Sequence, residues 1–328
     1  MPSSSTTSSA KTSFLARHIG RRLLWLVAVV VLVTFITYWL LNLVPGDPCQ
    51  VTLGAGATEE LLEECRDNNN LGDNLFVRYA SWLGDALTGY FGESYINRID
   101  VSTSLAQKLP ATMWLVFYTM LLTLLVSIPL GMLAAYRRGS WLDSLISSTS
   151  FGLLSTPAYV LGVILALLFS VRFNWFPLGG YVGPTESVLE HWKSLFLPAV
   201  TLASGAVPIY VRLLRDDMSQ NLEEDYAAFV TAKGMPTRRL LFRHVLRPSS
   251  FTLITIAGIN AAQLINSTII VEFLFDVDGI GSFLIASVFA QDYLVVQSVC
   301  AIIATAFVLL NTLVDTVYPA LDPRVRAR

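Results

Sequence analysis

Six long stretches of this chain contain no Asp, Glu, Lys or Arg. They cover residues 23–44, 111–136, 144–171, 194–211, 248–271 and 293–314. Each has at least 18 residues, which is long enough for an α-helix to cross the roughly 30 Å hydrocarbon core of a bilayer. A charge at mid-bilayer costs roughly 2.5–3.5 kcal/mol, so the absence of charge over these lengths is informative. The pattern predicts an all-α membrane protein with six transmembrane helices.

Prolines make two of the six stretches less regular than the others. Pro198 and Pro208 make residues 194–211 the weakest candidate, because each proline removes a helical hydrogen bond and the stretch is short. Pro157 predicts a break within the third stretch. We nevertheless expect both stretches to cross the membrane, since six is the count that uses every apolar stretch.

The composition of the whole chain supports the membrane interpretation. Hydrophobic residues make up 54% of the chain and charged residues 14%, whereas charged residues are about 25% of a typical soluble domain. The mean hydropathy is +0.58. These values argue against the alternative that the apolar stretches are buried core helices of a soluble protein. The formal net charge of −2 says little about partners, because the charges are segregated along the chain.

The basic residues predict the orientation of the chain in the membrane. If the N-terminus is cytoplasmic, only six of the 22 Lys and Arg residues lie outside: Arg66, Arg78, Arg98, Lys108, Arg172 and Lys193. Basic residues favour the cytoplasmic side, so both termini are predicted to be cytoplasmic. A cleaved signal peptide is the alternative for the start of the chain. A retained anchor is favoured, because the apolar run is long and lacks a small-residue cleavage site.

This orientation divides the chain into segments. Residues 1–20 are predicted to be a disordered cytoplasmic tail, 21–44 the first transmembrane helix, 45–110 a small extracytoplasmic insert, 111–321 a core of five further transmembrane helices, and 322–328 a cytoplasmic C-terminal tail. The loop 214–247 between the fourth and fifth spans is then cytoplasmic.

The loop 214–247 has the sequence of a folded element. Residues 222–233 contain good helix formers, Gly234 suits the left-handed end of a helix, and Pro236 cannot continue it. A second helix is predicted to follow. It has an apolar stripe and a basic face, formed respectively by Leu241, Phe242, Val245 and Leu246 and by Arg239, Arg243 and Arg247.

Two of the three cysteines lie in the extracytoplasmic insert. Cys49 and Cys65 are placed where oxidation is possible, whereas Cys300 is in the last span. Closing a loop of about 15 residues would contribute roughly 3 kcal/mol in the chain-entropy model. A disulfide is favoured over two free thiols. Acidic and aromatic residues in the same insert predict either a docking patch for a ligand or delivery protein, or a small folded cap.

The fifth span carries amide side chains at membrane depth. Asn260, Gln263 and Asn266 recur at every third residue and predict one polar face. This face is a candidate wall of a translocation pathway, and hydrogen bonding between helices is the alternative. The following segment contains residues 278–282, Asp-Gly-Ile-Gly-Ser, which predict a re-entrant or interfacial turn.

Catalytic and cofactor signatures are absent from the sequence. No Gly-x4-Gly-Lys-Ser/Thr loop and no Gly-x-Ser-x-Gly elbow occurs, and His18, His191 and His244 lie in three separate segments. The predicted spans also contain no acid or base to carry a coupling ion, which argues against a secondary transporter. We therefore expect neither an enzyme nor a metal or cofactor site, and ATP, if used, must bind another chain.

Short motifs along nearly the whole chain resemble one family. They are Arg21-Arg22-Leu23-Leu24, Pro45-Gly46-Asp47-Pro48, Leu109-Pro110-Ala111-Thr112, Ile128-Pro129-Leu130-Gly131, Asp225-Tyr226 with Ala232-Lys233-Gly234, Gly279-Ile280-Gly281, Asp292-Tyr293 with Val296-Gln297, and Leu321-Asp322-Pro323-Arg324. In this order and spacing the chain resembles the first of the two membrane permease subunits of peptide-type ABC importers, the oligopeptide, dipeptide and nickel permease family.

The resemblance implies a fold, a set of partners and a role for the loop 214–247. The fold would be that of ABC type I importer permeases, in a prokaryotic inner or plasma membrane. The loop would be the coupling loop to a cytoplasmic ATPase, with Asp225, Tyr226, Ala232, Lys233, Gly234, Arg238, Arg239 and His244 as its candidate residues. The partners would be a second permease subunit in a heterodimer, two ATPase domains that hold ATP and Mg, and an extracytoplasmic substrate-binding protein. No nucleic acid is implied.

The resemblance leaves two points open. The wider superfamily often has Glu-Ala-Ala six residues before the loop glycine, where this chain has Ala228-Phe229-Val230, so the acid that contacts the ATPase is not identified. Peptides are the first expectation for the substrate, and nickel chelates, glutathione, opines or oligosaccharides are the alternatives that similar proteins carry.

Overall fold

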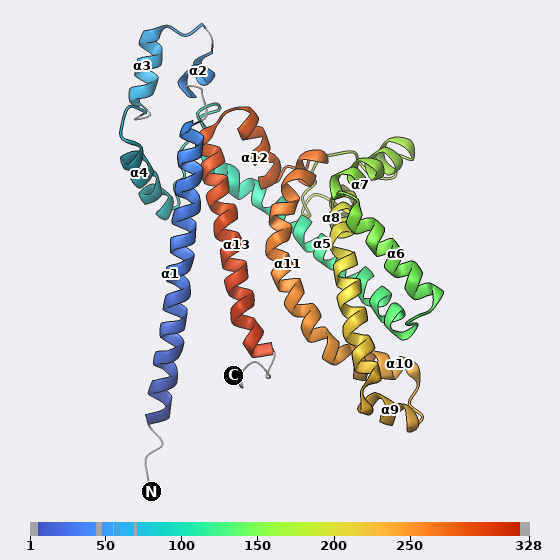
Figure 1. Cartoon of the computed structure of the whole chain (residues 1–328). Coiled ribbons are helices and arrows are strands. Elements are labelled where there is room, and N and C mark those ends of the chain that lie inside the picture. The colour runs from blue at the N-terminus through green and yellow to red at the C-terminus, as the bar shows by residue number, and fades with distance from the viewer. Residues whose placement is uncertain (1–5, 44–47, 55, 69–70, 322–328) are drawn as a thin grey trace. The chain divides into compact units, whose positions relative to one another are not determined.

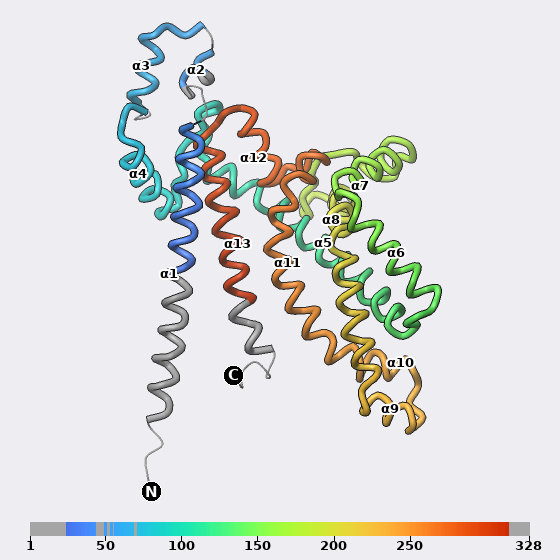
Figure 2. Tube along the Cα trace, viewed as in Figure 1, coloured from blue at the N-terminus to red at the C-terminus, as the bar shows by residue number. Residues whose placement is uncertain are grey.

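The computed structural model describes residues 6–43, 48–54, 56–68 and 71–321, and every regular element within these ranges is a helix. Figures 1 and 2 show the course of the chain. It divides into two compact units. The first contains residues 1–105 and 286–313, and the second contains residues 106–285 and 314–328. The predicted C-terminal tail, 322–328, lies outside the described residues.

The first unit begins with one long helix. Helix α1 spans Thr6–Leu43, so the prediction of a disordered tail over residues 1–20 is wrong from Thr6 onward, and residues 1–5 lie outside the described part. No Pro or Gly occurs between Thr6 and Ile19, so nothing in this stretch opposes the extension of the membrane helix toward the N-terminus.

Helix α4 (Leu75–Leu87) packs against α1 through aromatic side chains. Tyr79 and Trp82 are buried beside Tyr38, and the Tyr79 hydroxyl lies 2.8 Å from Thr34 Oγ1 and donates to the Val31 carbonyl at 2.9 Å. These contacts satisfy the Tyr79 hydroxyl in an otherwise apolar cluster. The first part of helix α13 (Tyr293–Leu321) joins the same cluster.

The two short helices before α4 are joined covalently. Helix α2 (Pro48–Leu53) and helix α3 (Glu59–Asn68) are linked by a disulfide between Cys49 and Cys65, the pairing that the sequence favoured. Leu62 is the one described residue of α3 that is buried. The remaining described side chains of α3 are exposed or half-buried, so the disulfide is the main tertiary restraint on this helix.

The second unit is built around helix α8 (Val188–Glu223). It packs with α6 (Trp141–Ser155), with α7 (Ala158–Leu165) and with α11 (Leu246–Leu274). Of the five helices with a span-length apolar window, α8 has the largest buried share of that window, 61%. The sequence rated this stretch weakest because of Pro198 and Pro208, yet both prolines lie inside the unbroken helix and are buried. Packing against α6, α7 and α11 stabilises the helix where its own hydrogen bonds are lost.

The number of spanning helices depends on how the third predicted span is counted. Helices α1, α5 (Val101–Tyr136), α8, α11 with its preceding turns, and α13 are each long and apolar enough to cross a membrane. The third predicted span is broken near Pro157, as expected: α6 and α7, the latter continued by the π-helix η1 (Ala166–Arg172), are bent by 99°. The described residues thus contain five spanning helices, or six if this bent pair is one span.

A buried acid lies near the end of α11. Glu272 is one residue beyond the predicted span 248–271, and it is 0% exposed. Its Oε2 accepts hydrogen bonds from the backbone N–H groups of Gly281 and Ser282, at 2.7 and 3.3 Å. These N–H groups begin the short helix α12 (Ile280–Phe289), which replaces the predicted turn. Glu272 is thus positioned as a helix cap, since the first N–H groups of a helix need outside acceptors.

The glycines of this turn are required by close contacts. A Cβ on Gly281 would lie 2.5 Å from the Cα of Ile269, and one on Gly279 would lie 2.3 Å from Glu272 Oε2. Thr112 of α5 completes the arrangement by accepting from the Ile280 N–H at 2.9 Å. The Gly-Ile-Gly motif therefore lets α12 begin directly against α11.

Candidate functional site

The loop between α8 and α11 folds into two short pieces that pack on the second unit. Helix α9 (Asp225–Ala232) is followed by the helical turn α10 (Thr237–Arg239) and the π-helix η2 (Leu240–Val245). We call residues 224–245 the α9–η2 segment. Its buried side chains are Ala227, Leu240 and Val245, and they join one apolar cluster with residues of α5 and α8. The segment is therefore attached to the spanning helices by apolar packing.

The π-helical turn changes the apolar face that the sequence predicted. Leu240 and Val245 are 7% and 0% exposed, whereas Phe242 is 56% exposed. A π-helix joins residues five apart, so the buried pair is Leu240 and Val245, and Phe242 points away from the cluster. The predicted stripe was wrong at Phe242 because it assumed α-helical spacing.

Asn221 joins the end of α8 to both neighbouring pieces. Its Nδ2 donates to Ser249 Oγ of α11 at 3.2 Å, and its Oδ1 accepts from the Tyr226 hydroxyl of α9 at 2.9 Å. Burial, and after it the charge of Glu224, raises the pKa of Tyr226. Tyr226 stays protonated at neutral pH and acts as a donor. One amide thus connects the three helices where the α9–η2 segment leaves the spans.

Gly234 forms the bend between α9 and the second piece. Its φ is +79°, and a Cβ built on it would meet nothing within 4 Å. Glycine adopts this left-handed conformation without the steric cost that other residues incur. The position thus requires glycine for its backbone angle, with space to spare around it.

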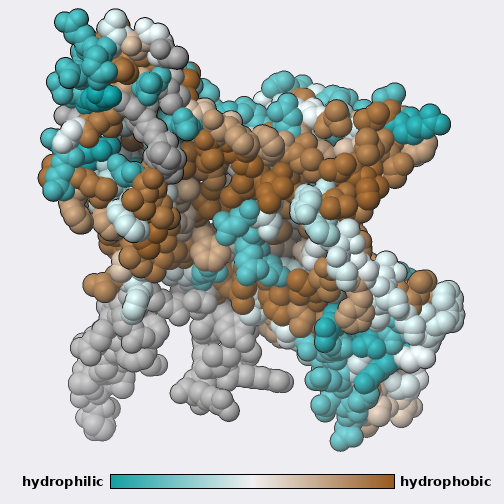
Figure 3. Space-filling view, turned by 45° about the horizontal axis from the view of Figure 1, so that its top comes forward, coloured by the Kyte–Doolittle hydropathy of each residue, from teal (hydrophilic) through white to brown (hydrophobic). Residues whose placement is uncertain are grey.

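The outer face of the α9–η2 segment is exposed, aromatic and basic. Figure 3 shows hydrophilic side chains gathered at the end of the second unit that carries α9 and α10, beside a hydrophobic surface. Phe229 is 60% exposed, and Lys233 Nζ lies 4.4 Å from the centre of its ring. Most of the predicted loop residues are exposed here, namely Asp225, Tyr226, Ala232, Lys233, Gly234, Arg238 and Arg239, while His244 is half-buried. Phe229 was not among the predicted loop residues, whereas Phe242 was predicted as part of the apolar stripe; both side chains lie on the solvent side of the loop.

A buried ion pair fixes α8 close to the start of this segment. Arg215 donates to Asp143 of α6 through Nε at 2.6 Å and Nη2 at 2.8 Å, and the Asp143 side chain is 6% exposed. Two parallel hydrogen bonds of this kind set both the distance and the angle between the groups. The ion pair couples α6 to the same helix that carries the α9–η2 segment.

A groove lies among the spanning helices, between α7, α8 and α11. Its volume is about 360 Å³, and its polar side chains are Asn260, Gln263 and Ser267 of α11 together with Tyr159 of α7. We call it the α8–α11 groove. On the side of α8 it is lined by Gly205, where a Cβ would meet nothing within 4 Å. The groove therefore has amide side chains on the α11 side and free space beside Gly205 on the α8 side.

One of the three predicted pathway residues lies off this groove. Asn260 and Gln263 line it, but Asn266 does not. An α-helix has 3.6 residues per turn, so positions i, i+3 and i+7 share a face and i+6 is turned away from the first by about 120°. Ser267 is the seventh residue after Asn260 and takes the place that the sequence analysis gave to Asn266.

The part of the chain that the structure describes contains no group of three or more His, Cys, Asp or Glu side chains that could hold a metal ion. The arrangement as a whole is a packed loop with an exposed aromatic and basic face, and a polar groove among spanning helices. Both features suit a protein that contacts a partner and lines a passage.

Comparison with known proteins gives a consistent set of relatives. Residues 127–327 match the family described as binding-protein-dependent transport system inner membrane component, and residues 15–116 match the N-terminal part of such components. The chain is similar to the probable peptide ABC transporter permease protein y4tP of Sinorhizobium fredii, with 35% identity over 94% of this chain and 99% of the relative. It is also similar to the oligopeptide transport system permease protein AppB of Bacillus subtilis, with 32% identity over 95% of this chain and 99% of that protein.

A third relative and a solved structure extend the comparison. The glutathione transport system permease protein GsiC of Escherichia coli is 28% identical over 94% of this chain and 98% of its own length. The fold is similar to that of an inward-facing MetNI methionine ABC transporter, with a TM-score of 0.56 and 16% identity over 67% of this chain and 96% of the solved chain. The predicted fold class, an all-α ABC type I importer permease, is confirmed.

Proposed function

Because the chain belongs to the family of binding-protein-dependent transport system inner membrane components, we propose that it forms half of a translocation pathway for peptides. As a permease subunit of an ABC importer, it leaves ATP hydrolysis to partner subunits. We also propose its substrate class, its translocation path and its mode of coupling to the ATPase. It places the protein in a prokaryotic inner membrane with both termini in the cytoplasm and the bent α6–α7 pair as the third of six spans.

The α8–α11 groove is the observation that supports the proposed pathway. Asn260 and Gln263 each present both a hydrogen-bond donor and an acceptor. A peptide backbone needs both wherever it leaves water, and amide side chains can supply them without binding any one side chain specifically. The names of y4tP and AppB refer to peptides and oligopeptides, which supports a peptide in this groove. The name of GsiC refers to glutathione, which remains an alternative cargo together with nickel chelates and oligosaccharides.

The α9–η2 segment supports coupling to a cytoplasmic ATPase. Its inner side packs on α5 and α8, while Tyr226, Phe229 and Phe242 present aromatic surface outward. An exposed aromatic patch with basic residues around it is the composition expected at the centre of a protein interface. A partner that binds this patch and moves would displace α8 and α11, because Asn221 and the apolar cluster connect the segment to both helices.

The proposed assembly contains a second permease subunit, two ATPase domains and an external binding protein that delivers the peptide. ATP and Mg belong to the ATPase domains. The exposed acids of the α9–η2 segment are Glu224 and Asp225, and either can pair with a basic residue of the ATPase. Peptide released on the outer side would pass through the α8–α11 groove when the ATPase domains close.

Reconstitution of the assembled importer in liposomes tests the proposal. We expect ATP-dependent uptake of a labelled tripeptide, and loss of that uptake when Gly205 is replaced by Leu, because the new side chain projects into the groove. Gly152→Leu is the matched control, since Gly152 lies in α6 and a Cβ there also meets nothing within 4 Å. Unchanged uptake in Gly205→Leu would contradict the path. Uptake of a nickel chelate or an oligosaccharide in place of any peptide would contradict the substrate class.

A further inference from the structure

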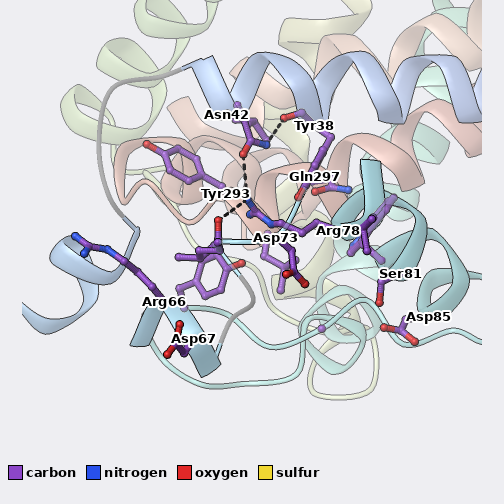
Figure 4. A pocket seen from close by; sticks show the side chains of 18 of the residues that line it. Tyr38, Asn42, Arg66, Asp67, Asp73, Arg78, Ser81, Asp85, Tyr293 and Gln297 are labelled. Atoms are coloured by element: carbon purple, nitrogen blue, oxygen red, sulfur yellow. Dashed lines mark hydrogen bonds between the residues drawn. The ribbon is translucent and has the colours of Figure 1, made fainter. Parts of the chain in front are cut away.

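A second and larger pocket lies in the first unit and has no part in the proposed pathway. Its volume is about 940 Å³, near the upper end of the range of ligand pockets, roughly 300–1,000 Å³. It is lined by the end of α1, by α3 and α4, and by the start of α13. We call it the α4 pocket. Figure 4 shows its polar side chains around a common space.

Three side chains that line the α4 pocket have buried polar atoms without a hydrogen-bond partner in the described chain. They are Trp82 Nε1, Tyr293 Oη and Gln297 Nε2. Trp82 is 8% exposed and Gln297 is 1% exposed. Buried polar groups of proteins are nearly always hydrogen-bonded. Each of these three groups can donate, and none has an acceptor within the described chain, so an acceptor that reaches them from the pocket would satisfy them.

A cationic side chain lies among these donors. Arg78 of α4 donates through Nη1 to Asn42 Oδ1 and to the Leu71 carbonyl, both at 3.4 Å, and its guanidinium lies 5.7 Å from the ring centre of Tyr38. Asn42 is itself held, since its Nδ2 donates to the Tyr38 carbonyl at 2.8 Å. Figure 4 shows this sequence of hydrogen bonds. Both of these bonds use Nη1, which leaves the other N–H groups of Arg78 to the neighbouring Tyr38 hydroxyl or to a carboxylate.

The rim of the pocket has the opposite charge. Four acids line it and are exposed: Glu63, Asp67, Asp73 and Asp85. The one other cation in the lining, Arg66, pairs with Glu59 at 3.0 Å. The α4 pocket therefore offers hydrogen-bond donors and one guanidinium in its interior, and carboxylates toward the solvent.

The inner wall of the pocket is built from the start of α13. Tyr293 and Gln297 are four residues apart and share a helix face. The buried Asp292 accepts a hydrogen bond from Ser94 Oγ, and Ser298 Oγ donates to the Phe91 carbonyl at 3.3 Å. These contacts bind α13 to the segment that returns from α4. The positions of the two unpartnered groups on α13 are thus fixed before any ligand arrives.

We propose that the α4 pocket binds a short peptide with free termini, as a site separate from the α8–α11 groove. The peptide carboxylate meets Arg78, its backbone carbonyls accept from Trp82, Tyr293 and Gln297, and its ammonium group faces the acids of the rim. The choice of a peptide among zwitterions rests in part on the proposed function. The site would hold peptide at the permease itself, between release from the delivering protein and entry into the pathway.

Calorimetry on the full chain in lipid nanodiscs tests this site with tri-alanine, its C-terminal amide and its N-acetyl form. We expect tri-alanine to bind saturably and the amide to bind at least about tenfold more weakly, since a hydrogen-bonded charge pair is lost. Arg78→Gln should weaken tri-alanine binding by a similar factor and leave the amide unchanged. Gln297→Leu should weaken all three peptides. The control is Arg98→Gln, which removes the same charge from an exposed position of the same unit outside the pocket.

Several results would overturn the site. They are the absence of saturable binding, equal binding of tri-alanine and its amide, or equal affinities of Arg78→Gln and Arg98→Gln. If Arg78→Gln fails to fold, the binding of the same three peptides is measured with Arg78→Lys and compared with the wild type. Docking of the delivering protein that depends on Arg78, without binding of free peptide, would also overturn it. ATP-driven uptake of tri-alanine without this binding refutes the site alone, whereas binding without peptide uptake by the assembled importer refutes the proposed function alone.

Discussion

The α9–η2 segment and the α2–α4 segment, residues 48–87, are held in place by different means. The first is attached by apolar side chains, with Ala227, Leu240 and Val245 buried among residues of spanning helices. In the second, α2 and α3 bury few side chains and are joined by the disulfide between Cys49 and Cys65. Each segment is a short helical element between spans, yet one packs against the spanning helices and the other is cross-linked within itself.

The difference matches what each segment is proposed to do. A loop that passes motion to spanning helices must not move independently of them, and a packed interior resists small displacements. A segment that contacts a peptide or a delivering protein needs a fixed local shape, and a cross-link supplies that without a large core. The comparison therefore predicts that damage to the α9–η2 segment affects transport more than damage to the α2–α3 pair.

The largest effect is expected from Gly234→Val, which would break the link between ATPase and spans. Valine at a φ of +79° costs about 1–2 kcal/mol, and the strain is relieved by turning α9 away from its contacts. We expect peptide uptake by the reconstituted importer to fall at least about tenfold, the factor set by 1.4 kcal/mol, while ATP hydrolysis continues. Parallel assays of uptake and phosphate release measure this uncoupling.

A second glycine provides the control for backbone strain. Gly139, in the turn between α5 and α6, has a φ of +77° and equally open surroundings. Gly139→Val should carry the same strain outside the α9–η2 segment and leave uptake and hydrolysis coupled. Equal uncoupling in both variants would show that strain anywhere near the spans is sufficient, and the special role of the α9–η2 segment would be lost.

A smaller effect on uptake is expected from removal of the disulfide. Replacing Cys49 and Cys65 by Ser should destabilise the α2–α3 pair by about 3 kcal/mol in the chain-entropy model. The pair should then be cut by protease at low concentration, while the thermal unfolding of the remaining helices stays unchanged. Uptake should fall by less than in Gly234→Val. A loss of uptake equal to that of Gly234→Val would remove the contrast between the two segments.

The smallest effect is expected when Asp100, which caps the start of α5, is protonated. Asp100 accepts hydrogen bonds from the Ser102 and Thr103 N–H groups, both at 3.1 Å, at the start of α5. Burial pushes the pKa of Asp100 up, but these bonds and that of the Thr103 hydroxyl outweigh it and hold the pKa below its ordinary value of 3.8. The folded state therefore binds the proton less tightly than the unfolded state. The cap is present above pH 3.8 and is lost as the pH falls through the lower folded pKa.

Hydrogen exchange at the first amides of α5 measures this cap. Exchange in the wild type, corrected for the intrinsic pH dependence, should rise roughly two- to fivefold on acidification below the folded pKa. Asp100→Asn keeps a capping oxygen without the charge, so its corrected exchange should not change with pH in this range. An identical pH response in both proteins would assign the effect to another group.

The sequence predicted the elements well wherever charge, glycine or proline decides the local structure. Spans without charge, a loop bounded by Gly234 and Pro236, and a break at Pro157 all follow from local chemistry. It was less successful where a residue's role depends on its neighbours. Pro198 and Pro208 suggested a weak helix, but α8 packs against α6, α7 and α11 and is unbroken. Phe242 was placed on the same apolar stripe as Val245 because nothing in the local sequence indicates a π-helical turn.

Site residues show the same limit. Asn260 and Gln263 could be found from amide groups at helical spacing, and Ser267 would have followed from strict use of the 3.6-residue period. Glu272 lay one residue beyond the stretch counted as uncharged, and its role becomes visible only when Gly281 is seen beside it. The α4 pocket joins side chains from position 38 to position 297, and no local pattern brings such distant residues together.

The bond between Cys49 and Cys65 also imposes an order on the biogenesis of the protein. Thiols stay reduced in the cytosol, so in the proposed topology this bridge closes only after residues 48–68 have been translocated and have met an oxidant. The α9–η2 segment needs no such step and can dock with its partner once the helices that it packs against have been inserted. Newly made protein would therefore pass through a stage in which the cytoplasmic loop is folded but the disulfide on the outer side has not yet formed. The supply of oxidising catalyst would set how long that stage lasts.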